Sequence, residues 1–130
     1  MSPAAPGPLT VVVPVYNAPE EVHGCLSSVQ ATVPRDTQVI VIDDASPDAS
    51  VAEVLRGWSD RVNGRWQFLG NAENLGFVAT ANRGMRETSG DVVLLNSDTI
   101  VTSGWLQGLQ RCLAADASIA TATPLSLIHI

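Results

Sequence analysis

The sequence contains no lysine, and this absence excludes several familiar kinds of nucleotide site. The phosphate-binding loop G-x-x-x-x-G-K-[ST] requires a lysine, and the usual site of a phosphorelay receiver includes one as well. The patterns G-x-G-x-x-G, typical of dinucleotide binding, and G-x-S-x-G, typical of hydrolases, are also missing. Seven arginines stand against thirteen acidic residues, which gives a formal net charge of −6. Nucleic-acid binding requires a basic face, and the sequence has no basic cluster that would form one.

Charged residues make up only 15% of the chain, whereas 45% of the residues are hydrophobic. A disordered chain has the opposite balance, so the composition predicts a folded core, and 130 residues fit a single domain. The uninterrupted apolar runs are too short to span a membrane. Residues 1–8 are rich in proline and lack the basic and apolar parts of a signal peptide, so we expect a disordered leader.

The two cysteines, Cys25 and Cys112, lie far apart in stretches with helical patterns. Their separation excludes a local zinc knuckle and a C-x-x-C redox pair, and two thiols do not form a disulfide framework. Unpaired cysteine is among the most buried residue types. We therefore interpret both as buried free thiols of a protein in a reducing compartment.

After the leader, short β-branched runs alternate with amphipathic helical patterns. Parallel neighbouring strands need a crossover that a helix supplies, so this alternation predicts an α/β domain with a mainly parallel sheet and helices on both faces. The predicted strands are Leu9–Val15, Gln38–Ile42, Trp66–Leu69 and Asp91–Leu95, with a fifth beginning in Ser118–Ala122. The predicted helices run from Pro19 to before Pro34, over Ser50–Trp58, over Gly76–Glu87, and from an N-cap at Ser103 through Leu113.

Each predicted helix has an apolar face that would pack on the sheet. The strand order cannot be read from this periodicity. The predicted inner faces are, in chain order, Val22, Leu26 and Val29; Val51, Val54, Leu55 and Trp58; Phe77, Ala81 and Met85; and Leu106, Leu109 and Leu113.

The sequence of the last six residues, 125–130, is typical of a cloning or sequencing artefact. They are what the codons CTG-TCT-CTT-ATA-CAC-ATC encode, and that string resembles a transposon adapter used in library preparation for sequencing. A tail of that origin does not belong to the natural domain. We therefore expect a domain over 9–124 that is cut near Pro124, followed by a non-native tail. The alternative is a genuine apolar strand that closes the domain.

Polar residues follow three of the predicted strands, in the segments Pro14–Asn17, Asp43–Ser46 and Asn96–Thr99. If the strands are parallel, all three segments lie at one edge of the sheet, where ligands of such folds bind. Asp43, Asp44 and Asp98 would then place three carboxylates around one crevice. Oxygen ligands of this kind suit Mg²⁺ or Mn²⁺ bound together with substrate phosphates. The alternative for each segment is a turn with a helix cap.

A second candidate segment is Asn74–Gly84, which has a glycine at a predicted helix start and an arginine two turns later. The N–H groups of a helix start, together with its dipole, favour a diphosphate. Arg83 would add a fork of donors to phosphate oxygens. The alternative is a plain helix start with a solvated arginine.

Read together, these segments resemble the N-terminal part of a family 2 glycosyltransferase with the Rossmann-like GT-A fold, truncated at its C-terminus. The resemblance covers residues 9 to about 124, in order and spacing. It is carried by Val11–Asn17 (VVVPVYN), Val39–Asp48 (VIVIDDASPD), Asn74–Phe77 (NLGF) with Asn82–Gly84 (NRG), and Ser89–Thr99 (SGDVVLLNSDT).

The resemblance implies a role for each matching residue. Asp43 would accept a hydrogen bond from a pyrimidine ring, with Asp44 beside it, and Asp98 would be the ligand of a divalent metal, Mg²⁺ or Mn²⁺. Asn96 replaces the first aspartate of the family's D-x-D motif, which resembles the rhamnosyltransferase-like branch with deoxythymidine-diphosphate donors. The implied nucleotide-binding residues are Pro14, Val15, Tyr16 and Asn17 at the base, Asp43 and Asp44, Asn82 and Arg83 near the diphosphate, and Asn96 and Ser97.

The resemblance also implies the reaction, an inverting sugar transfer from a uridine- or deoxythymidine-diphosphate sugar to a carbohydrate or lipid-linked acceptor. The family's general base comes from a later segment, so this chain would be the donor-binding half and inactive alone. We expect a cytoplasmic protein, working at the inner membrane face in its full-length form. One alternative is a non-catalytic nucleotide- or metal-binding module. A sugar-nucleotide pyrophosphorylase is disfavoured, because Tyr16–Pro19 contains neither glycine nor charge.

Overall fold

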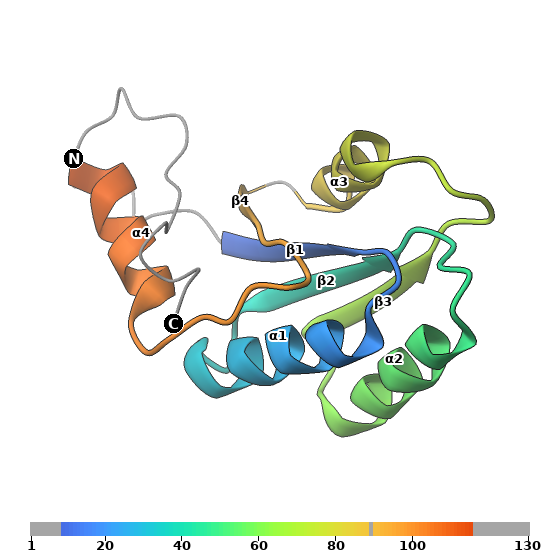
Figure 1. Cartoon of the computed structure of the whole chain (residues 1–130). Coiled ribbons are helices and arrows are strands. Elements are labelled where there is room, and N and C mark those ends of the chain that lie inside the picture. Colours follow the sequence, from blue (N-terminus) through green and yellow to red (C-terminus); the bar gives the residue numbers. More distant parts are fainter. Residues whose placement is uncertain (1–8, 89, 116–130) are drawn as a thin grey trace.

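The computed structural model describes residues 9–88 and 90–115, in which four strands alternate with four helices. The predicted leader, the strand beginning in Ser118–Ala122, the side chain of Leu113 and the tail over 125–130 lie outside the described residues. The strands are β1 (Leu9–Val15), β2 (Gln38–Asp43), β3 (Trp66–Gly70) and β4 (Asp91–Leu94), and the helices are α1 (Pro19–Thr32), α2 (Ala49–Arg61), α3 (Phe77–Arg86) and α4 (Trp105–Ala115) (Figure 1).

The four strands form one fully parallel sheet in the order β3-β2-β1-β4. Val15 at the end of β1 pairs with Asp43, and Asp43 pairs with Gly70, so the carboxyl ends of three strands are level. The chain builds the sheet outward from β1 to β3 and then returns to the other side of β1. The order therefore reverses between β1 and β4, which is where open α/β sheets bind ligands.

Helices cover both faces of the sheet, as the sequence predicts (Figure 1). One face of β1 and β2 packs with α1, α2 and α4 in a core that includes Val11, Val13, Leu26, Trp58 and Leu106. The other face carries the smaller core of Val12, Ile40 and Ile42, which lies on the side of α3. Burial on both faces explains why these strands are continuous β-branched runs without polar alternation.

The predicted inner face of α3 is wrong in part. Phe77 and Met85 are 52% and 36% exposed, and the helix instead buries Thr80, Ala81 and Gly84. A Cβ atom at Gly84 would lie 2.5 Å from Val12 Cγ1 and 3.0 Å from Ile42 Cδ1. The helix therefore approaches the sheet through its smallest residue, and this close approach turns the larger apolar side chains toward its flanks.

We expect Gly84→Ala to destabilise the protein by about 2–3 kcal/mol, because the added methyl group overpacks two buried side chains. The matched control is Gly57→Ala, also in the interior of a helix, where a Cβ atom meets nothing within 4 Å. That control is expected to stabilise by about 0.5–1 kcal/mol, the ordinary helix-propensity gain. Chemical denaturation of both variants measures the difference, and equal effects would contradict the close approach.

The remaining predictions about helices and cysteines need two corrections. α4 begins at Trp105, directly after Gly104 with a φ of 83°, so Ser103 is one residue too early to be its N-cap. Cys25 is fully buried, but Cys112 is exposed.

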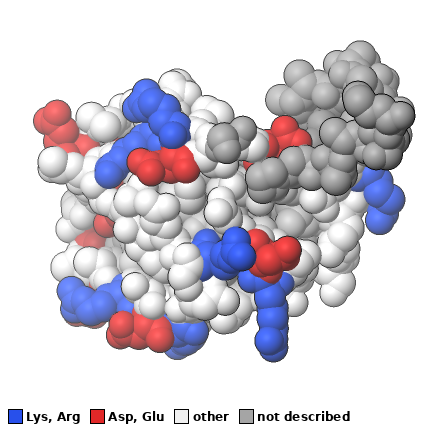
Figure 2. All heavy atoms as spheres, turned by 180° about the vertical axis from the view of Figure 1, so that it is seen from behind, with Lys and Arg blue, Asp and Glu red and all other residues white. Residues whose placement is uncertain are grey.

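Among the described helices, none combines the length and the apolar character that crossing a bilayer requires. On the face drawn in Figure 2, basic and acidic side chains alternate among uncharged residues.

Candidate functional site

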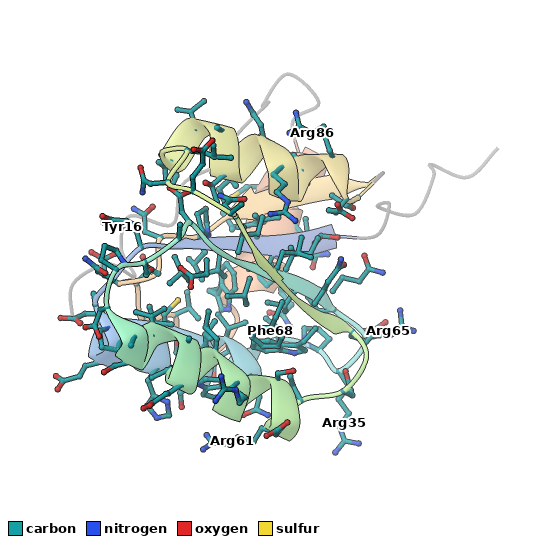
Figure 3. The ribbon with its side chains drawn as sticks, turned by 90° about the vertical axis from the view of Figure 1, so that its right-hand side faces the viewer. Tyr16, Arg35, Arg61, Arg65, Phe68 and Arg86 are labelled. Carbon is teal, nitrogen blue, oxygen red and sulfur yellow. The ribbon has the colours of Figure 1, made fainter. Side chains whose placement is uncertain are left out.

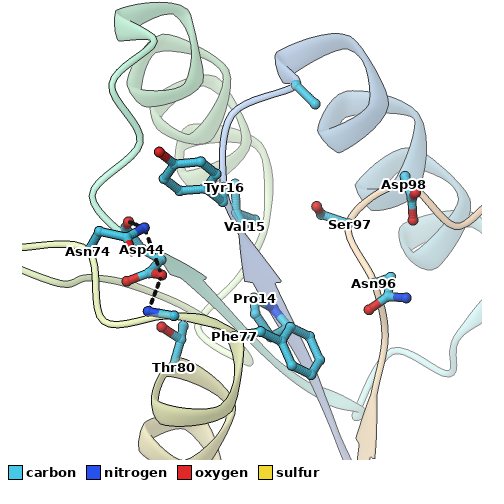
Figure 4. A pocket seen from close by; sticks show the side chains of 12 residues that line it. Pro14, Val15, Tyr16, Asp44, Asn74, Phe77, Thr80, Asn96, Ser97 and Asp98 are labelled. Atoms are coloured by element: carbon cyan, nitrogen blue, oxygen red, sulfur yellow. Dashed lines mark hydrogen bonds between the residues drawn. The ribbon is translucent and has the colours of Figure 1, made fainter.

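A cavity of about 370 Å³ opens at the carboxyl ends of β1, β2 and β4, beside the start of α3 (Figure 4). This is the edge of the sheet where the sequence places its polar segments, and it includes the point at which the strand order reverses. The lining residues are Pro14, Val15, Tyr16, Ala18, Asp44, Asn74, Gly76, Phe77, Thr80, Asn96, Ser97 and Asp98.

The end of β1 forms the centre of the cavity. Pro14 and Val15 are buried in the strand, whereas the ring of Tyr16 is 49% exposed. In Figure 3, Tyr16 lies at the opposite end of the sheet from Arg35 and Arg65, which precede β2 and β3. The ring of Tyr16, which the sequence assigns to the nucleotide base, lines the cavity.

Asn17 and Asp43 hold the loops around the cavity and do not line it. The backbone N–H of Asn17 donates to Ser46 Oγ at 2.8 Å, and Asn17 Oδ1 accepts from the backbone N–H of Asp48 at 3.1 Å. Asp43 Oδ1 accepts from the backbone N–H and the hydroxyl of Ser46, at 3.0 and 2.6 Å. The expectation of three carboxylates around one crevice is therefore corrected: Asp44 and Asp98 line the cavity, and Asp43 caps its own turn.

Asp44 is 4% exposed, and each of its carboxylate oxygens has two hydrogen-bond donors. Oδ1 accepts from Asn71 Nδ2 and from the backbone N–H of Leu75, both at 2.8 Å. Oδ2 accepts from Asn74 Nδ2 at 3.2 Å and from the backbone N–H of Gly76 at 2.9 Å (Figure 4). Burial raises the pKa of Asp44, but the bonds donated by Leu75, Asn71 and Gly76 lower it by more, so its pKa lies below the usual range.

A protein carboxylate lies at the residues that directly precede α3. The backbone N–H groups of Leu75 and Gly76 donate to Asp44, and the prediction that the N–H groups of the helix start bind a diphosphate stays a prediction. A carboxylate beside the positive end of the helix dipole is a favourable arrangement. This carboxylate comes from the end of β2, so sequence spacing within the helix gave no sign of it.

Arg83 and Asn82 lie on α3 away from the cavity lining. Arg83 Nη1 donates to the backbone oxygen of Gly70 and to Asn71 Oδ1, both at 2.7 Å. With its oxygen held by Arg83, Asn71 directs its Nδ2 to Asp44 and to Thr80 Oγ1, at 2.8 and 2.9 Å. These bonds from Nη1 fasten α3 to the end of β3, and the contact between Arg83 and a phosphate stays a prediction.

The segment after β4 forms the remaining wall. Asn96, Ser97 and Asp98 all line the cavity, and Asp98 is exposed there. The backbone N–H of Thr99 donates to the backbone oxygen of Asn96 at 3.0 Å and closes a turn that contains these three residues. No group of three or more metal-ligating side chains occurs among residues 9–88 and 90–115. One accessible carboxylate fits a Mg²⁺ or Mn²⁺ ion that takes its other ligands from substrate phosphates and water.

Sequence reasoning missed four side chains of the cavity: Ala18, Asn74, Phe77 and Thr80. Asn74 and Phe77 stand in the segment that carries the family resemblance, but the helical spacing of Phe77 placed it in the core. Thr80 faces the cavity because α3 turns its small residues to the sheet. No pattern in the sequence pointed to Asn71, which contributes through long-range hydrogen bonds alone.

Comparison with known sequences supports the resemblance. Residues 10–126 match the sequence model of the family described as "Glycosyl transferase family 2". A validoxylamine A glucosyltransferase of Streptomyces hygroscopicus subsp. limoneus is 36% identical over 117 residues, which cover 88% of this chain and 25% of that protein. The glycosyltransferase GlyA of Streptococcus pneumoniae is 30% identical over 104 residues, covering 79% of this chain and 14% of that protein. The chain thus spans a quarter or less of these relatives.

Comparison with solved structures supports the fold. A mannosyltransferase of Pyrobaculum calidifontis, solved in complex with GDP-Man and Mn²⁺, superposes with a TM-score of 0.78 at 24% sequence identity. The superposition covers 89% of this chain and 34% of that chain. The mainly parallel sheet with helices on both faces is therefore the GT-A arrangement that the resemblance predicted.

Proposed function

Because this chain belongs to glycosyl transferase family 2, we propose that its cavity binds a nucleoside-diphosphate sugar, from which the longer protein transfers the sugar to an acceptor hydroxyl. The observation that carries the proposal is the cavity at the reversal of strand order, which joins Tyr16 after β1 to Asp98 after β4. Its volume of about 370 Å³ lies in the range of small-molecule sites.

The base would lie at the end of the cavity beside Tyr16. An exposed aromatic ring offers a face for stacking, and Pro14 and Val15 supply an apolar floor. Asn74 donates its Nδ2 to Asp44, which leaves its Oδ1 as an acceptor for an N–H group of the base. The contact between Asp43 and a base stays a prediction, and it requires Ser46 to release the carboxylate.

The diphosphate would lie toward Asp98. None of the residues lining the cavity is basic, and Nη1 of Arg83 is engaged at the end of β3. A divalent cation held by Asp98 would supply the charge neutralisation that a leaving diphosphate needs. Asn96 and Ser97 lie beside Asp98 and offer uncharged oxygens to the same cation. The donor is a uridine- or deoxythymidine-diphosphate sugar, and Asn96 in the place of the first aspartate favours the rhamnosyltransferase-like branch with deoxythymidine-linked donors.

The proposed transfer inverts the anomeric centre. An acceptor hydroxyl, from a carbohydrate or a lipid-linked saccharide, attacks the anomeric carbon while the bond to the diphosphate oxygen breaks and its electron pair leaves with the diphosphate. The acceptor proton passes to a general base. Within the described part of the chain, the carboxylates of the cavity are Asp44, which is saturated, and Asp98, which is assigned to the metal. We therefore place the base elsewhere in the longer protein, which would act in the cytoplasm where sugar nucleotides are available.

Titration of this chain with UDP, dTDP and GDP tests the proposal, with isothermal calorimetry in Mn²⁺ and in EDTA as the measurement. We expect at least one diphosphate to bind, and to bind more tightly in Mn²⁺. Tyr16→Ala should weaken that binding about tenfold, because it removes the stacking face, while Tyr16→Phe should retain it. The absence of binding by all three diphosphates, or equal affinity for Tyr16→Ala and the wild type, would contradict the proposal.

A further inference from the structure

One side of α1 carries three polar residues that all contact the segment between Asn96 and Trp105. Cys25, Ser28 and Thr32 follow one another at intervals of three and four residues, so they lie on the same side of the helix. We call these three residues the α1 polar stripe. The segment they contact contains Asp98, the carboxylate assigned to the metal.

Each residue of the α1 polar stripe holds one atom of that segment. Cys25 Sγ donates to the backbone oxygen of Asn96 at 3.6 Å. Ser28 Oγ accepts from the backbone N–H of Val101 at 3.1 Å. Thr32 Oγ1 accepts from the indole Nε1–H of Trp105 at 2.8 Å. The three contacts therefore fall two residues before Asp98, three residues after it and seven residues after it.

The hydroxyl groups of the stripe have fixed orientations. Ser28 donates its hydrogen to the backbone oxygen of Cys25 at 2.8 Å, and Thr32 donates to the backbone oxygen of Ser28 at 2.7 Å. A hydroxyl group has a single hydrogen. Because each hydrogen is used inside the helix, as helical serine and threonine commonly do, the lone pairs are left for the N–H groups of Val101 and Trp105.

Cys25, Val101 and Trp105 are buried and Ser28 and Thr32 are half-buried, whereas Asp98 is exposed. Cys25 is fully buried, and Val101 and Trp105 are 3% and 4% exposed. Burial raises the pKa of the Cys25 thiol to about 12, although the backbone of Thr99 lowers it in part, so the thiol stays protonated as a donor. Asp98 itself has no side-chain hydrogen bond within residues 9–88 and 90–115. Its position therefore depends on the hydrogen bonds that hold the segment on either side of it.

We infer that the α1 polar stripe, through Ser28 above all, positions Asp98 for the divalent metal of the donor site. This inference rests on the proposed function and deepens it. Ser28 lies outside the cavity lining, so it is a positioning residue and not a ligand. A metal shared between one carboxylate and a diphosphate needs both at bonding distance at once. Release of the Val101 N–H frees the segment, and this weakens the metal-dependent part of nucleotide binding while leaving the base contacts intact.

The test compares the affinities in Mn²⁺ and in EDTA for whichever of UDP, dTDP and GDP binds the wild type. Ser28→Ala is expected to reduce the ratio of the two affinities about tenfold, as losses of partners behind a metal ligand do, with the affinity in EDTA unchanged. Ser28→Thr keeps the hydroxyl group, so its ratio of affinities in Mn²⁺ and in EDTA should equal that of the wild type. Ser27→Ala is the matched control, because Ser27 is the exposed neighbour on the same helix. Thermal unfolding of each variant is measured in parallel.

Three outcomes would overturn the inference. In the first, Ser28→Ala has the same ratio as Ser27→Ala and the wild type. In the second, Ser28→Ala loses affinity equally in Mn²⁺ and in EDTA, which indicates general damage to the fold. In the third, the wild type binds no diphosphate, so that the proposed function fails and the inference falls with it. In the first two, wild-type binding stays metal-dependent, which separates failure of the inference from failure of the proposed function.

Discussion

Asp44→Ala is expected to lower the free energy of unfolding by about 3 kcal/mol or more. The substitution leaves four donors, from Asn71, Asn74, Leu75 and Gly76, without the carboxylate that accepts from them. A buried group that loses its partner costs about 1–3 kcal/mol, and more where the partner is charged. Because two of these donors are backbone groups at the start of α3, the wall of the cavity should loosen as well. Denaturant unfolding and diphosphate titration measure the two effects.

The matched control for this substitution is Glu73→Gln. Glu73 is an exposed carboxylate in the same loop, so its loss should change stability by less than about 0.5 kcal/mol. If Asp44→Ala is no more damaging than Glu73→Gln, the hydrogen bonds around Asp44 do not hold the loop.

The pH dependence of Asp44→Asn gives an independent check of the charge. The folded-state pKa of Asp44 lies below the unfolded value, so its contribution is present above the unfolded pKa, about 4, and is lost as the pH falls through the folded pKa. The stability difference between the wild type and Asp44→Asn should therefore be constant from about pH 5 to 7 and narrow below about pH 4. Unfolding curves recorded from pH 3 to 7 measure it, and a difference that grows in acid would contradict the lowered pKa.

Asp98→Asn is expected to abolish the effect of Mn²⁺ on diphosphate binding. Asp98 is the exposed carboxylate of the cavity, and the amide that replaces it carries no charge. The affinity in Mn²⁺ should fall at least about tenfold, to the value measured in EDTA. The affinity in EDTA should stay the same, because Tyr16 and the base site lie at the other wall. Calorimetric titration in the two conditions measures both numbers.

Two further variants make this prediction specific. Asn96→Asp adds a second carboxylate to the same wall and should strengthen the effect of Mn²⁺, since Asn96 also lines the cavity. Asp91→Asn removes an exposed carboxylate from the amino end of β4, away from the cavity, and should leave the effect unchanged. Retention of metal-dependent binding by Asp98→Asn would remove Asp98 from the metal site.

Local patterns in the sequence predicted most of the secondary structure. The β-branched runs of β1 and β2 are buried on both faces, and such runs have few other places in a folded domain. Val22, Leu26 and Val29 bury the predicted face of α1 for the same reason. The inner face of α3 was predicted less well, because Phe77 and Met85 fit the period but Gly84 fits the space above Val12.

The segments that form the candidate site were predicted from the sequence, but the side chains within them only in part. Parallel strands end at one edge, so the segments after β1, β2 and β4 lie at that edge in any order, and they meet because these three strands are neighbours in the sheet. Which member of a pair faces the cavity depends on the turn that follows the strand. Ser46 turns Asp43 away, and Asn71, Asn74 and α3 surround Asp44. Neither turn has a signature in the spacing of the two aspartates.

The alternation of strands and helices and the edge at which Tyr16 and Asp98 lie could be predicted from local burial and helix periodicity, and the family from the order of its motifs. The strand order, the hydrogen bonds of Asp44 and Arg83 around the loop before α3, and the contact of α1 with the Asp98 segment could not be predicted in this way. These features are hydrogen bonds between residues far apart in sequence. Their partners are chosen by the packing of whole elements, and no spacing along the chain records that choice.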